Sequence, residues 1–207
     1  MYLPRHFSET DIDILHELID EVGTATVTTA VDGNITANQV PLLLDRGENC
    51  LLGHLARPNA QLQDLAVESE VLVNFVGPEA YISPSWYGDV GMVPTWNFVS
   101  VQVRGQAEVL DQPDAVLDIV QRLTQRAEVT FDEPWTIDKV PKGKLAKMLT
   151  SIVGFRIDIH DIQGKFKLSQ NRKPGDIAGA IKGLRSRPAE RGMAEFMEAH
   201  LKTCISR

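Results

Sequence analysis

The 207-residue sequence lacks the signatures of several common protein classes. It contains two cysteines, Cys50 and Cys204, and neither has a partner at metal-binding spacing, so it predicts two reduced thiols rather than a disulfide framework or a zinc site. The five histidines are scattered, with none three or four residues from another, which argues against a metal site on one helix face. Glycine-rich phosphate loops, the HExxH zinc motif and the GxSxG nucleophile motif are absent as well. The protein classes recognised by those motifs are therefore excluded.

Long apolar runs are also missing. No uncharged apolar segment approaches the ~18–20 residues that a membrane-spanning helix needs, and the first eight residues contain no apolar core of a secretory signal. We therefore expect a cytoplasmic protein without membrane contact. Hydrophobic residues make up 43% of the chain and charged residues 24%, which is typical of a soluble globular protein and excludes a disordered chain.

The net charge of -7 is unevenly distributed along the chain. From Lys165 to the C-terminus there are ten Lys and Arg residues against four Asp and Glu residues, a net charge of +6, so the first 164 residues carry -13. A basic region that follows an acidic one predicts contact with a nucleic acid, with a phosphorylated ligand, or with the acidic surface of the protein itself. The charges alone leave these three alternatives open.

Short segments of alternating or β-branched residues dominate the hydrophobic pattern. Asp32-Gly33, between the first two of them, is typical of a two-residue hairpin turn. Pro41 lies inside the second segment and, because it has no N–H, predicts an edge strand, a bulge or a ligand contact there. The pattern predicts six or seven strands, over residues 24–29, 35–44, 50–55, 71–76, 80–83, 95–109 and 151–161. Helices are predicted over residues 11–21, 61–67, 114–127, 144–149, 176–185 and 189–202.

This order of elements favours a mainly β fold with added helices, an α+β arrangement. Many short strands separated by turns are typical of an antiparallel barrel or sandwich rather than a doubly wound parallel sheet. The residues after about 172 contain only helical patterns, so they are expected to form a helical appendage.

Three clusters of polar or aromatic residues stand out. Residues 54–59 end a predicted strand and begin a predicted helix, so Arg57 indicates either an anion site or an ordinary surface arginine at a turn. Half of the six Trp and Tyr residues lie between Tyr81 and Gly88, which indicates a ligand site, a subunit interface or a packed core. Residues 164–175 contain four cations, which suit a phosphate or form a solvated basic loop.

Four segments in this chain resemble the hallmark segments of the PaiB-like family, whose members are described as FMN-binding negative transcriptional regulators. The segments are Met1-Tyr2-Leu3-Pro4-Arg5-His6-Phe7, Ser83-Pro84-Ser85-Trp86-Tyr87, Val93-Pro94-Thr95-Trp96-Asn97 and Lys167-Leu168-Ser169-Gln170-Asn171-Arg172. The resemblance extends from residue 1 to about 200, and four motifs in the right order are more specific than any one of them. It implies a split β-barrel of antiparallel strands over residues 1–172, with a C-terminal helical appendage over residues 173–207. It also implies a homodimer that holds FMN at the subunit interface.

The resemblance assigns two groups of residues in the first half of the chain to this flavin site. The strand that contains Gln39 and Val40 would lie along the edge of the isoalloxazine ring. The segment that follows would face the ribityl phosphate, with His54, Ala56, Arg57 and Asn59.

Two further groups come from the second half of the chain. Three residues would line the flavin pocket, namely Thr95, Trp96 and Asn97. Three others would close the site or neutralise the charge of the phosphate, namely Lys167, Gln170 and Arg172. No metal ligand is predicted, and the catalytic residues, if any, stay unknown.

The sequence therefore predicts an FMN-binding homodimer that regulates transcription and contacts DNA through its basic C-terminal region. Two other functions stay open. The first is a flavin-dependent oxidoreductase acting on a small molecule, in which His54 or Tyr81 could move a proton. The second is a haem-binding split barrel, for which His54 or His160 would supply the axial ligand.

Overall fold

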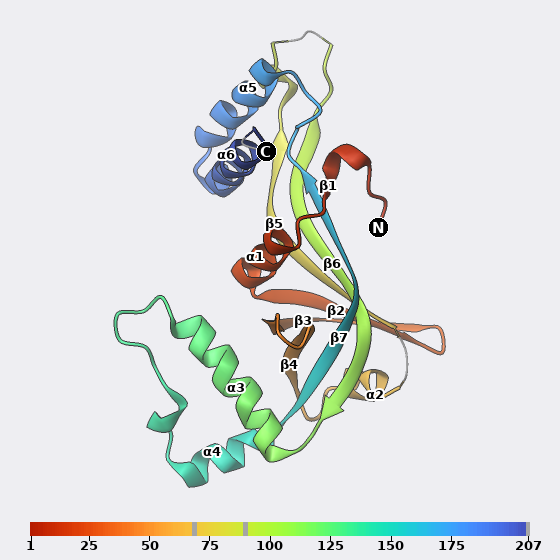
Figure 1. The fold of residues 1–207 in the computed structure, drawn as a ribbon, viewed down its shortest axis with the longest axis vertical. Coiled ribbons are helices and arrows are strands. Elements are labelled where there is room, and N and C mark those ends of the chain that lie inside the picture. Colours follow the sequence, from red (N-terminus) through yellow and green to blue (C-terminus); the bar gives the residue numbers. More distant parts are fainter. Residues whose placement is uncertain (68–69, 89–90, 206–207) are drawn as a thin grey trace. The chain divides into compact units, whose positions relative to one another are not determined.

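The computed structural model describes residues 1–67, 70–88 and 91–205, with side chains up to Leu201 (Figure 1). The predicted turn at residues 89 and 90 and the side chain of Cys204 lie outside the described part of the chain. Seven strands are formed, namely β1 (Ser8–Glu9), β2 (Thr24–Val31), β3 (Asn34–Asp45), β4 (Cys50–Ala56), β5 (Glu70–Ile82), β6 (Thr95–Leu110) and β7 (Ile152–Lys167). The α-helices are α1 (Ile12–Val22), α2 (Gln61–Leu65), α3 (Pro113–Glu128), α4 (Lys142–Leu149), α5 (Pro174–Arg185) and α6 (Arg191–Ile205). Short 3-10 helices add η1 (Arg5–Phe7), η2 (Pro84–Trp86), η3 (Ile137–Lys139) and η4 (Pro188–Glu190).

The strands form one sheet in the order β1-β7-β4-β3-β2-β5-β6, and β6 also pairs with β7. The order of six strands therefore returns on itself, because β7 is hydrogen-bonded to both β4 and β6. Every pair with a defined register is antiparallel, including β2 with β3 and β4 with β7. The predicted fold class, antiparallel strands with added helices rather than a doubly wound parallel sheet, is confirmed.

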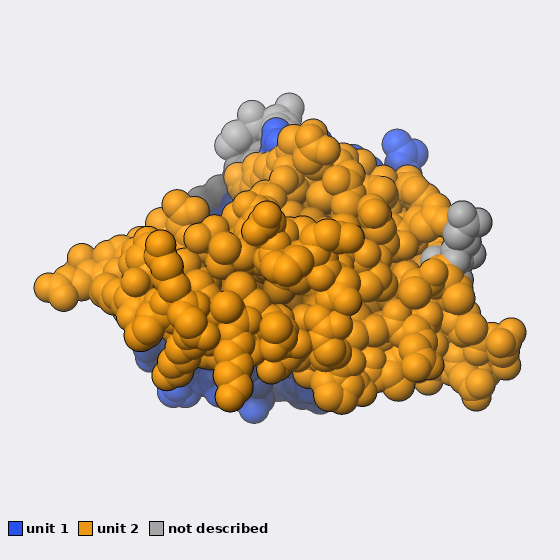
Figure 2. Space-filling view, turned by 90° about the horizontal axis from the view of Figure 1, so that it is seen from below, with its two compact units in different colours: residues 1–15, 76–101, 163–207 blue, residues 16–75, 102–162 orange. Residues whose placement is uncertain are grey.

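The chain divides into two compact units, which Figure 2 shows in different colours. Unit 1 contains residues 1–15, 76–101 and 163–207, and unit 2 contains residues 16–75 and 102–162. Strands β5, β6 and β7 each contribute residues to both units. Unit 1 thus collects the N-terminus, the middle and the C-terminus of the chain. The predicted division at residue 172, into a barrel and an appendage, stays a prediction.

Unit 2 contains the hairpin that the Asp32-Gly33 turn predicts, because these two residues connect β2 to β3. Strand β3 pairs with β2 as far as Pro41 and with β4 from Leu42 onward. Pro41 therefore lies where the pairing changes partner, not on an edge strand, and its missing N–H falls at the end of the β2 pairing. Helix α3 covers this part of the sheet and shares a core with β4, formed by Cys50, Leu52 and Ile119.

Unit 1 is built around the end of β7 and the two C-terminal helices. Phe166 and Leu168 are fully buried, as are Ala180 and Leu184 of α5 and Met193, Ala194 and Met197 of α6. Helix α5 packs against η2, and a Cβ atom at Gly183 would overlap the indole ring of Trp86. Only glycine allows this close approach, which fixes the Ser-Pro-Ser-Trp-Tyr segment to α5.

Strand β7 runs on to Lys167, six residues beyond the predicted end at 161. The extension exists because β1 pairs with it, Ser8 opposite Lys165 and Glu9 opposite Gly164. This pairing joins residues more than 150 positions apart, so no local pattern could predict it. In the part of the chain that the structure describes, no helix is both long and apolar enough to span a membrane.

Candidate functional site

A surface of cations and aromatic rings lies in unit 1, where the end of β7 meets the start of β6. Three cations, Lys165, Lys167 and Arg172, define it, and we call it the unit 1 cationic surface. The Lys167 Nζ atom donates hydrogen bonds to Thr95 Oγ1 (2.5 Å) and to the carbonyl oxygen of Trp96 (2.6 Å). These bonds place three of the predicted site residues, Thr95, Trp96 and Lys167, side by side.

The other two cations are held against aromatic rings. The Lys165 Nζ atom lies 5.5 Å from the ring centroid of Tyr2 and 5.4 Å from that of Phe98. The Arg172 guanidinium lies 5.7 Å from the ring centroid of Tyr87. Cation–π contacts of this kind orient a positive charge without neutralising it. The cations therefore keep their capacity to bind an anion.

The unit 1 cationic surface carries an excess of positive charge. Burial lowers the pKa of Lys167, and the positive charges of Lys165 and Arg172 lower it further. Among the described residues, no carboxylate lies within 4 Å of any of these three cations. A half-buried ammonium between two other cations is unfavourable unless a negative charge joins them. The arrangement thus suits a phosphorylated or otherwise anionic ligand.

An accessible ring system adjoins these cations. The Trp96 residue is 53% exposed, and its ring meets that of Tyr81 edge to face with 5.9 Å between centroids. Trp86 and Tyr87, by contrast, pack against α5 and into the interior of unit 1. The aromatic cluster in the sequence therefore divides into a packed part and an open part, and the open part suits a planar ligand.

Two predicted site residues of unit 1 have their polar atoms bonded within the unit. Asn97 is fully buried, and its Oδ1 atom accepts a hydrogen bond from Ser169 Oγ (3.1 Å). The Gln170 side chain accepts from the backbone N–H of Leu168 (2.7 Å) and donates to the carbonyl oxygen of Phe166 (2.6 Å). These bonds shape the turn after β7, in which Ser169 has a positive φ of 63°. The turn carries the chain from Lys167 to Arg172.

The remaining six predicted residues belong to unit 2. Val40 is buried, whereas the exposed Gln39 side chain accepts from Thr26 Oγ1 (3.0 Å) and donates to Thr24 Oγ1 (3.1 Å) across the β2–β3 pair. Ala56 is exposed at the end of β4. The Asn59 Oδ1 atom accepts a hydrogen bond from the backbone N–H of Gln61 (2.9 Å), the first residue of α2, although the N-cap position of that helix is Ala60.

A buried polar network around Gln61 is absent from the sequence-based prediction. Gln61 is fully buried, accepts a hydrogen bond from Asn38 Nδ2 (2.9 Å) and donates to the carbonyl oxygen of Val27 (3.0 Å). Thr29, also fully buried, donates to Asp64 Oδ2 (2.8 Å). The network ties α2 to the β2–β3 hairpin and so fixes the segment that follows Arg57. A glutamine two residues after Asn59, at the start of a predicted helix, was the only signal in the sequence.

Arg57 lies at the end of β4 with its guanidinium bonded inside unit 2. Its Nη1 and Nη2 atoms donate to the two carboxylate oxygens of Asp111 (3.0 and 2.6 Å), and its Nε atom donates to the carbonyl oxygen of Thr150 (2.7 Å). A further bond joins Nη2 to the carbonyl oxygen of Ile152 (3.2 Å). The hydrogen bond from Arg57 lowers the pKa of Asp111. Four of the five N–H groups of the guanidinium are thus in use, and Arg57 joins three chain segments.

His54 is half-buried in β4, and burial lowers its pKa below the ordinary value. Protonation therefore favours the unfolded chain. The stability that the neutral imidazole provides is complete above about pH 6.5, the ordinary pKa, and declines as the pH falls toward the lower pKa of the folded state. Urea unfolding at pH 7.5 and 5.5 should show a smaller acid-induced loss for His54→Gln than for the unmodified chain. An identical loss in both proteins would remove His54 from this pH dependence.

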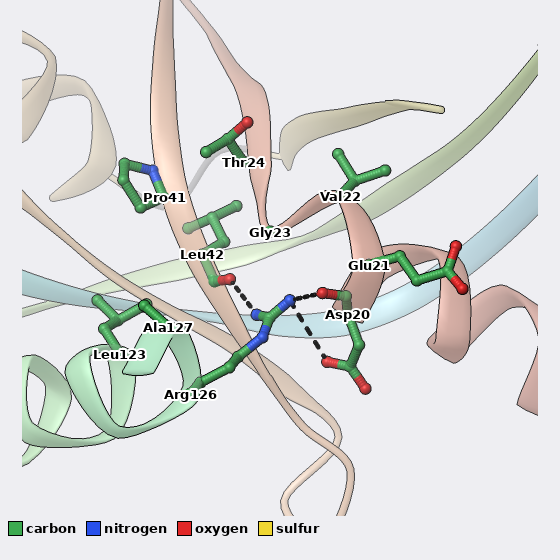
Figure 3. A pocket seen from close by; sticks show the side chains of 10 residues that line it. All are labelled: Asp20, Glu21, Val22, Gly23, Thr24, Pro41, Leu42, Leu123, Arg126 and Ala127. Carbon is green, nitrogen blue, oxygen red and sulfur yellow. Dashed lines mark hydrogen bonds and ion pairs between the residues drawn. The ribbon is translucent and has the colours of Figure 1, made fainter. Parts of the chain in front are cut away.

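Unit 2 also contains a cavity of about 360 Å³ between the end of α1, strand β3 and helix α3 (Figure 3). The Arg126 guanidinium points into it and donates to the carbonyl oxygens of Leu42 (2.9 Å), Ile19 (3.3 Å) and Asp20. Two of these carbonyls belong to the last turn of α1, so Arg126 caps that helix. None of the twelve predicted site residues lines this cavity.

Comparisons with known proteins agree with this fold. The family model described as "Putative FMN-binding domain" matches residues 1–161. The chain is 35% identical to protease synthase and sporulation protein PAI 2 of Bacillus subtilis (strain 168), over 99% of this chain and 100% of that protein.

Two solved structures have similar folds at low sequence identity. The flavocytochrome Anf3 from Azotobacter vinelandii has a TM-score of 0.62 and 13% identity, with 85% of this chain and 78% of that chain covered. The FAD and heme binding protein from Mycobacterium smegmatis has a TM-score of 0.59 and 19% identity, with 83% and 79% covered. The structures support the fold, and the family match and the Bacillus relative support the resemblance carried by the four sequence motifs. The chain belongs to the PaiB-like family, whose matching model is described as a putative FMN-binding domain.

Proposed function

We propose that this protein is a homodimer that binds FMN and regulates transcription. The observation that supports this proposal most directly is the unit 1 cationic surface, where Lys165, Lys167 and Arg172 have no carboxylate within 4 Å among the described residues. The names of the similar proteins agree with a flavin, because the two structural neighbours are a flavocytochrome and an FAD and heme binding protein. FMN specifically is supported by the description of the matching family.

The residues of this surface fit the chemistry of FMN. Its phosphate carries about two negative charges at neutral pH, which three cations without acidic partners would balance. Its planar ring needs an accessible aromatic or apolar surface, and Trp96 with Tyr81 offers one. The buried hydroxyl of Tyr87 has no hydrogen-bond partner among the described residues, so a ligand oxygen that reached it would satisfy an unpaired polar group. When bound, FMN supplies reversible electron transfer, while the protein binds and orients it.

Arg57 was also predicted to contact the phosphate, and Arg57→Ala is expected to weaken FMN binding tenfold or more. The physical reason is that the Arg57 guanidinium, now bonded to the Asp111 carboxylate, could bind the phosphate of FMN in its place, and alanine removes this guanidinium. Fluorescence titration of the apoprotein with FMN measures the effect, and Asp111→Asn is the matched control because it frees the same guanidinium. Unchanged affinity in Arg57→Ala would leave Arg57 as a link between chain segments only.

Two parts of the proposal, the homodimer and the regulatory role, go beyond the fold and have their own support. The resemblance implies that flavin is held at the interface of two subunits, so the mass in solution should be that of a dimer. The relative from Bacillus is named for protease synthesis and sporulation, which agrees with a role in gene control. A strictly monomeric protein would contradict the interface site.

Two alternative functions are a haem-binding protein and a flavin-dependent oxidoreductase. The names of the two structural neighbours, which combine a flavin with a cytochrome or haem, favour a tetrapyrrole. The lowered pKa of His54 keeps its imidazole neutral, which is the form that binds iron.

The absorbance spectrum of the purified protein separates these functions. We expect the two bands of a bound oxidised flavin, and FMN should restore them after the protein has been stripped of ligand. A Soret band in place of the flavin bands would support the haem-binding alternative. Reduction of the bound flavin by NADH or NADPH with turnover of an acceptor would support an oxidoreductase. A colourless protein that binds no FMN would overturn the proposal.

A further inference from the structure

A patch of positive charge outside the flavin site lies on η3 and α4 of unit 2. Four lysines, Lys139, Lys142, Lys144 and Lys147, fall within nine residues, and all four are exposed. Residues 139–149 contain no Asp or Glu. Within the described ranges 1–67, 70–88 and 91–205, none of the four ammonium groups forms an ion pair or a hydrogen bond. We call this patch the α4 lysine surface, after the helix α4 that Figure 1 labels.

In the basic C-terminal region, by contrast, some of the positive charges are paired with carboxylates. Arg185 forms an ion pair with Glu198 (2.6 Å), and Arg187 forms one with Glu190 (3.1 Å). Part of the positive charge of the last 43 residues is therefore neutralised within unit 1. The α4 lysine surface has no such partners in the described part of the chain, although the protein as a whole is acidic.

The placement of these lysines is also unfavourable for α4 itself. The first turn of the helix carries Lys142 and Lys144 and no acidic residue. Cations at a helix N-terminus oppose the helix dipole, and the capping residue Pro141 supplies no side-chain hydrogen bond. No residue of α4 is fully buried, so the helix contributes little to the core. Local folding therefore does not explain why lysine occupies these positions.

We propose that the α4 lysine surface binds the phosphate backbone of a nucleic acid duplex. The proposal rests on the regulatory part of the proposed function and specifies where the contact with DNA lies. A helix of eight residues is about 12 Å long, and a duplex presents one negative charge about every 1.7 Å along its axis. An anionic membrane fits less well, because α4 exposes one large apolar side chain, Met148, whereas interfacial helices need a broad apolar face.

The salt dependence of binding is a direct signature of this contact. Four lysine–phosphate contacts give a slope of about -3.6 for log K against log salt concentration, so affinity should fall roughly a hundredfold between about 50 and 200 mM salt. The α4 variant replaces all four lysines with glutamine, which keeps helix propensity. The control variant replaces four other cations with glutamine and changes the net charge equally. They are Lys182 and Arg185 of α5, Arg187 directly before η4, and Arg191 of α6.

The experiment measures fluorescence anisotropy of a labelled DNA duplex of mixed sequence with the full-length protein and both variants. We expect the α4 variant to lose at least tenfold in affinity and most of the salt slope, and the control variant to lose less than threefold. Equal losses in both variants, or a larger loss in the control, would overturn the proposal. It would also be overturned if the unmodified protein bound no duplex at about 50 mM salt. Stronger binding to phosphatidylglycerol vesicles than to DNA, with the same dependence on the four lysines, would replace the nucleic acid with a membrane.

FMN titration of the same three proteins separates this proposal from the flavin site. The α4 variant should bind FMN with unchanged affinity, since none of its four lysines belongs to the unit 1 cationic surface. Loss of DNA binding with FMN binding intact supports the α4 lysine surface. A protein that binds DNA through these lysines but takes up no FMN would contradict the proposed flavin site and leave this contact standing.

Discussion

Gly105→Ala is expected to destabilise the protein by about 2–3 kcal/mol, because the added methyl group overpacks a closed site. A Cβ atom at Gly105 of β6 would overlap the carbonyl oxygen of Asp158 in β7 and would also press on the side chain of Ile157. A backbone oxygen in a strand cannot move aside as the end of a flexible side chain can. The two strands would have to separate where β6 joins β7, which is the pairing that returns the strand order on itself.

Urea unfolding followed by circular dichroism measures this loss. The control is Gly143→Ala in α4, where an added Cβ atom meets nothing within 4 Å. That change should leave the protein unchanged or stabilise it by about 0.4–1 kcal/mol, since alanine restricts the unfolded chain more than glycine does. Equal stability of the two variants would show that the approach of β6 to β7 is not as close as described.

Lys167→Ala is expected to weaken FMN binding by about tenfold to a hundredfold while leaving the stability of the apoprotein almost unchanged. A charge-assisted hydrogen bond to a phosphate is worth about 1.5–3 kcal/mol, and each 1.4 kcal/mol is a tenfold change in affinity. In the apoprotein, by contrast, Lys167 is partly desolvated and lies near Lys165 and Arg172, which is why its pKa is lowered. Its removal relieves this repulsion, and the Thr95 and Trp96 oxygens that it leaves belong to residues that are not fully buried.

Two measurements on the same variant test this contrast. Fluorescence titration gives the FMN affinity, and urea unfolding without FMN gives the stability. Lys167→Arg keeps the charge and should retain most of the affinity, and Lys182→Ala, at an exposed lysine of α5, should change neither quantity. If Lys167→Ala lost stability and bound FMN as before, Lys167 would be a structural residue.

Local sequence patterns predicted most of the elements, because each depends on residues close together in the chain. The alternation in residues 24–44 with Asp32-Gly33 predicted the β2–β3 hairpin, and the apolar spacing from Ile12 to Ile19 predicted α1. Both patterns work because a half-buried strand and a one-sided helix have different periods. The end of β7 was predicted too early, since its last residues are strand only where β1 pairs with them.

The candidate site was predicted only in part, because the sequence motifs are local and many contacts of the site are not. The motifs identified Thr95, Trp96 and Lys167, and the structure brings these three together through two hydrogen bonds. The motifs did not indicate that Arg57 is engaged by Asp111 and by the carbonyl oxygens of Thr150 and Ile152, which are more than 50 positions away in the chain. Nor did composition indicate which of the many cations have acidic partners.

The sequence by itself determined the family, the antiparallel class of the fold and the positions of most helices and strands, because motifs, turn residues and hydrophobic periods are local properties. The tertiary structure alone decided which charges are paired and which are left to a ligand. Arg185 and Arg187 have carboxylates within reach, whereas Lys167 and the lysines of α4 have none among the described residues. The physical reason is that the energy of a charge depends on its neighbours within a few ångströms, and the fold chooses those neighbours from distant parts of the chain.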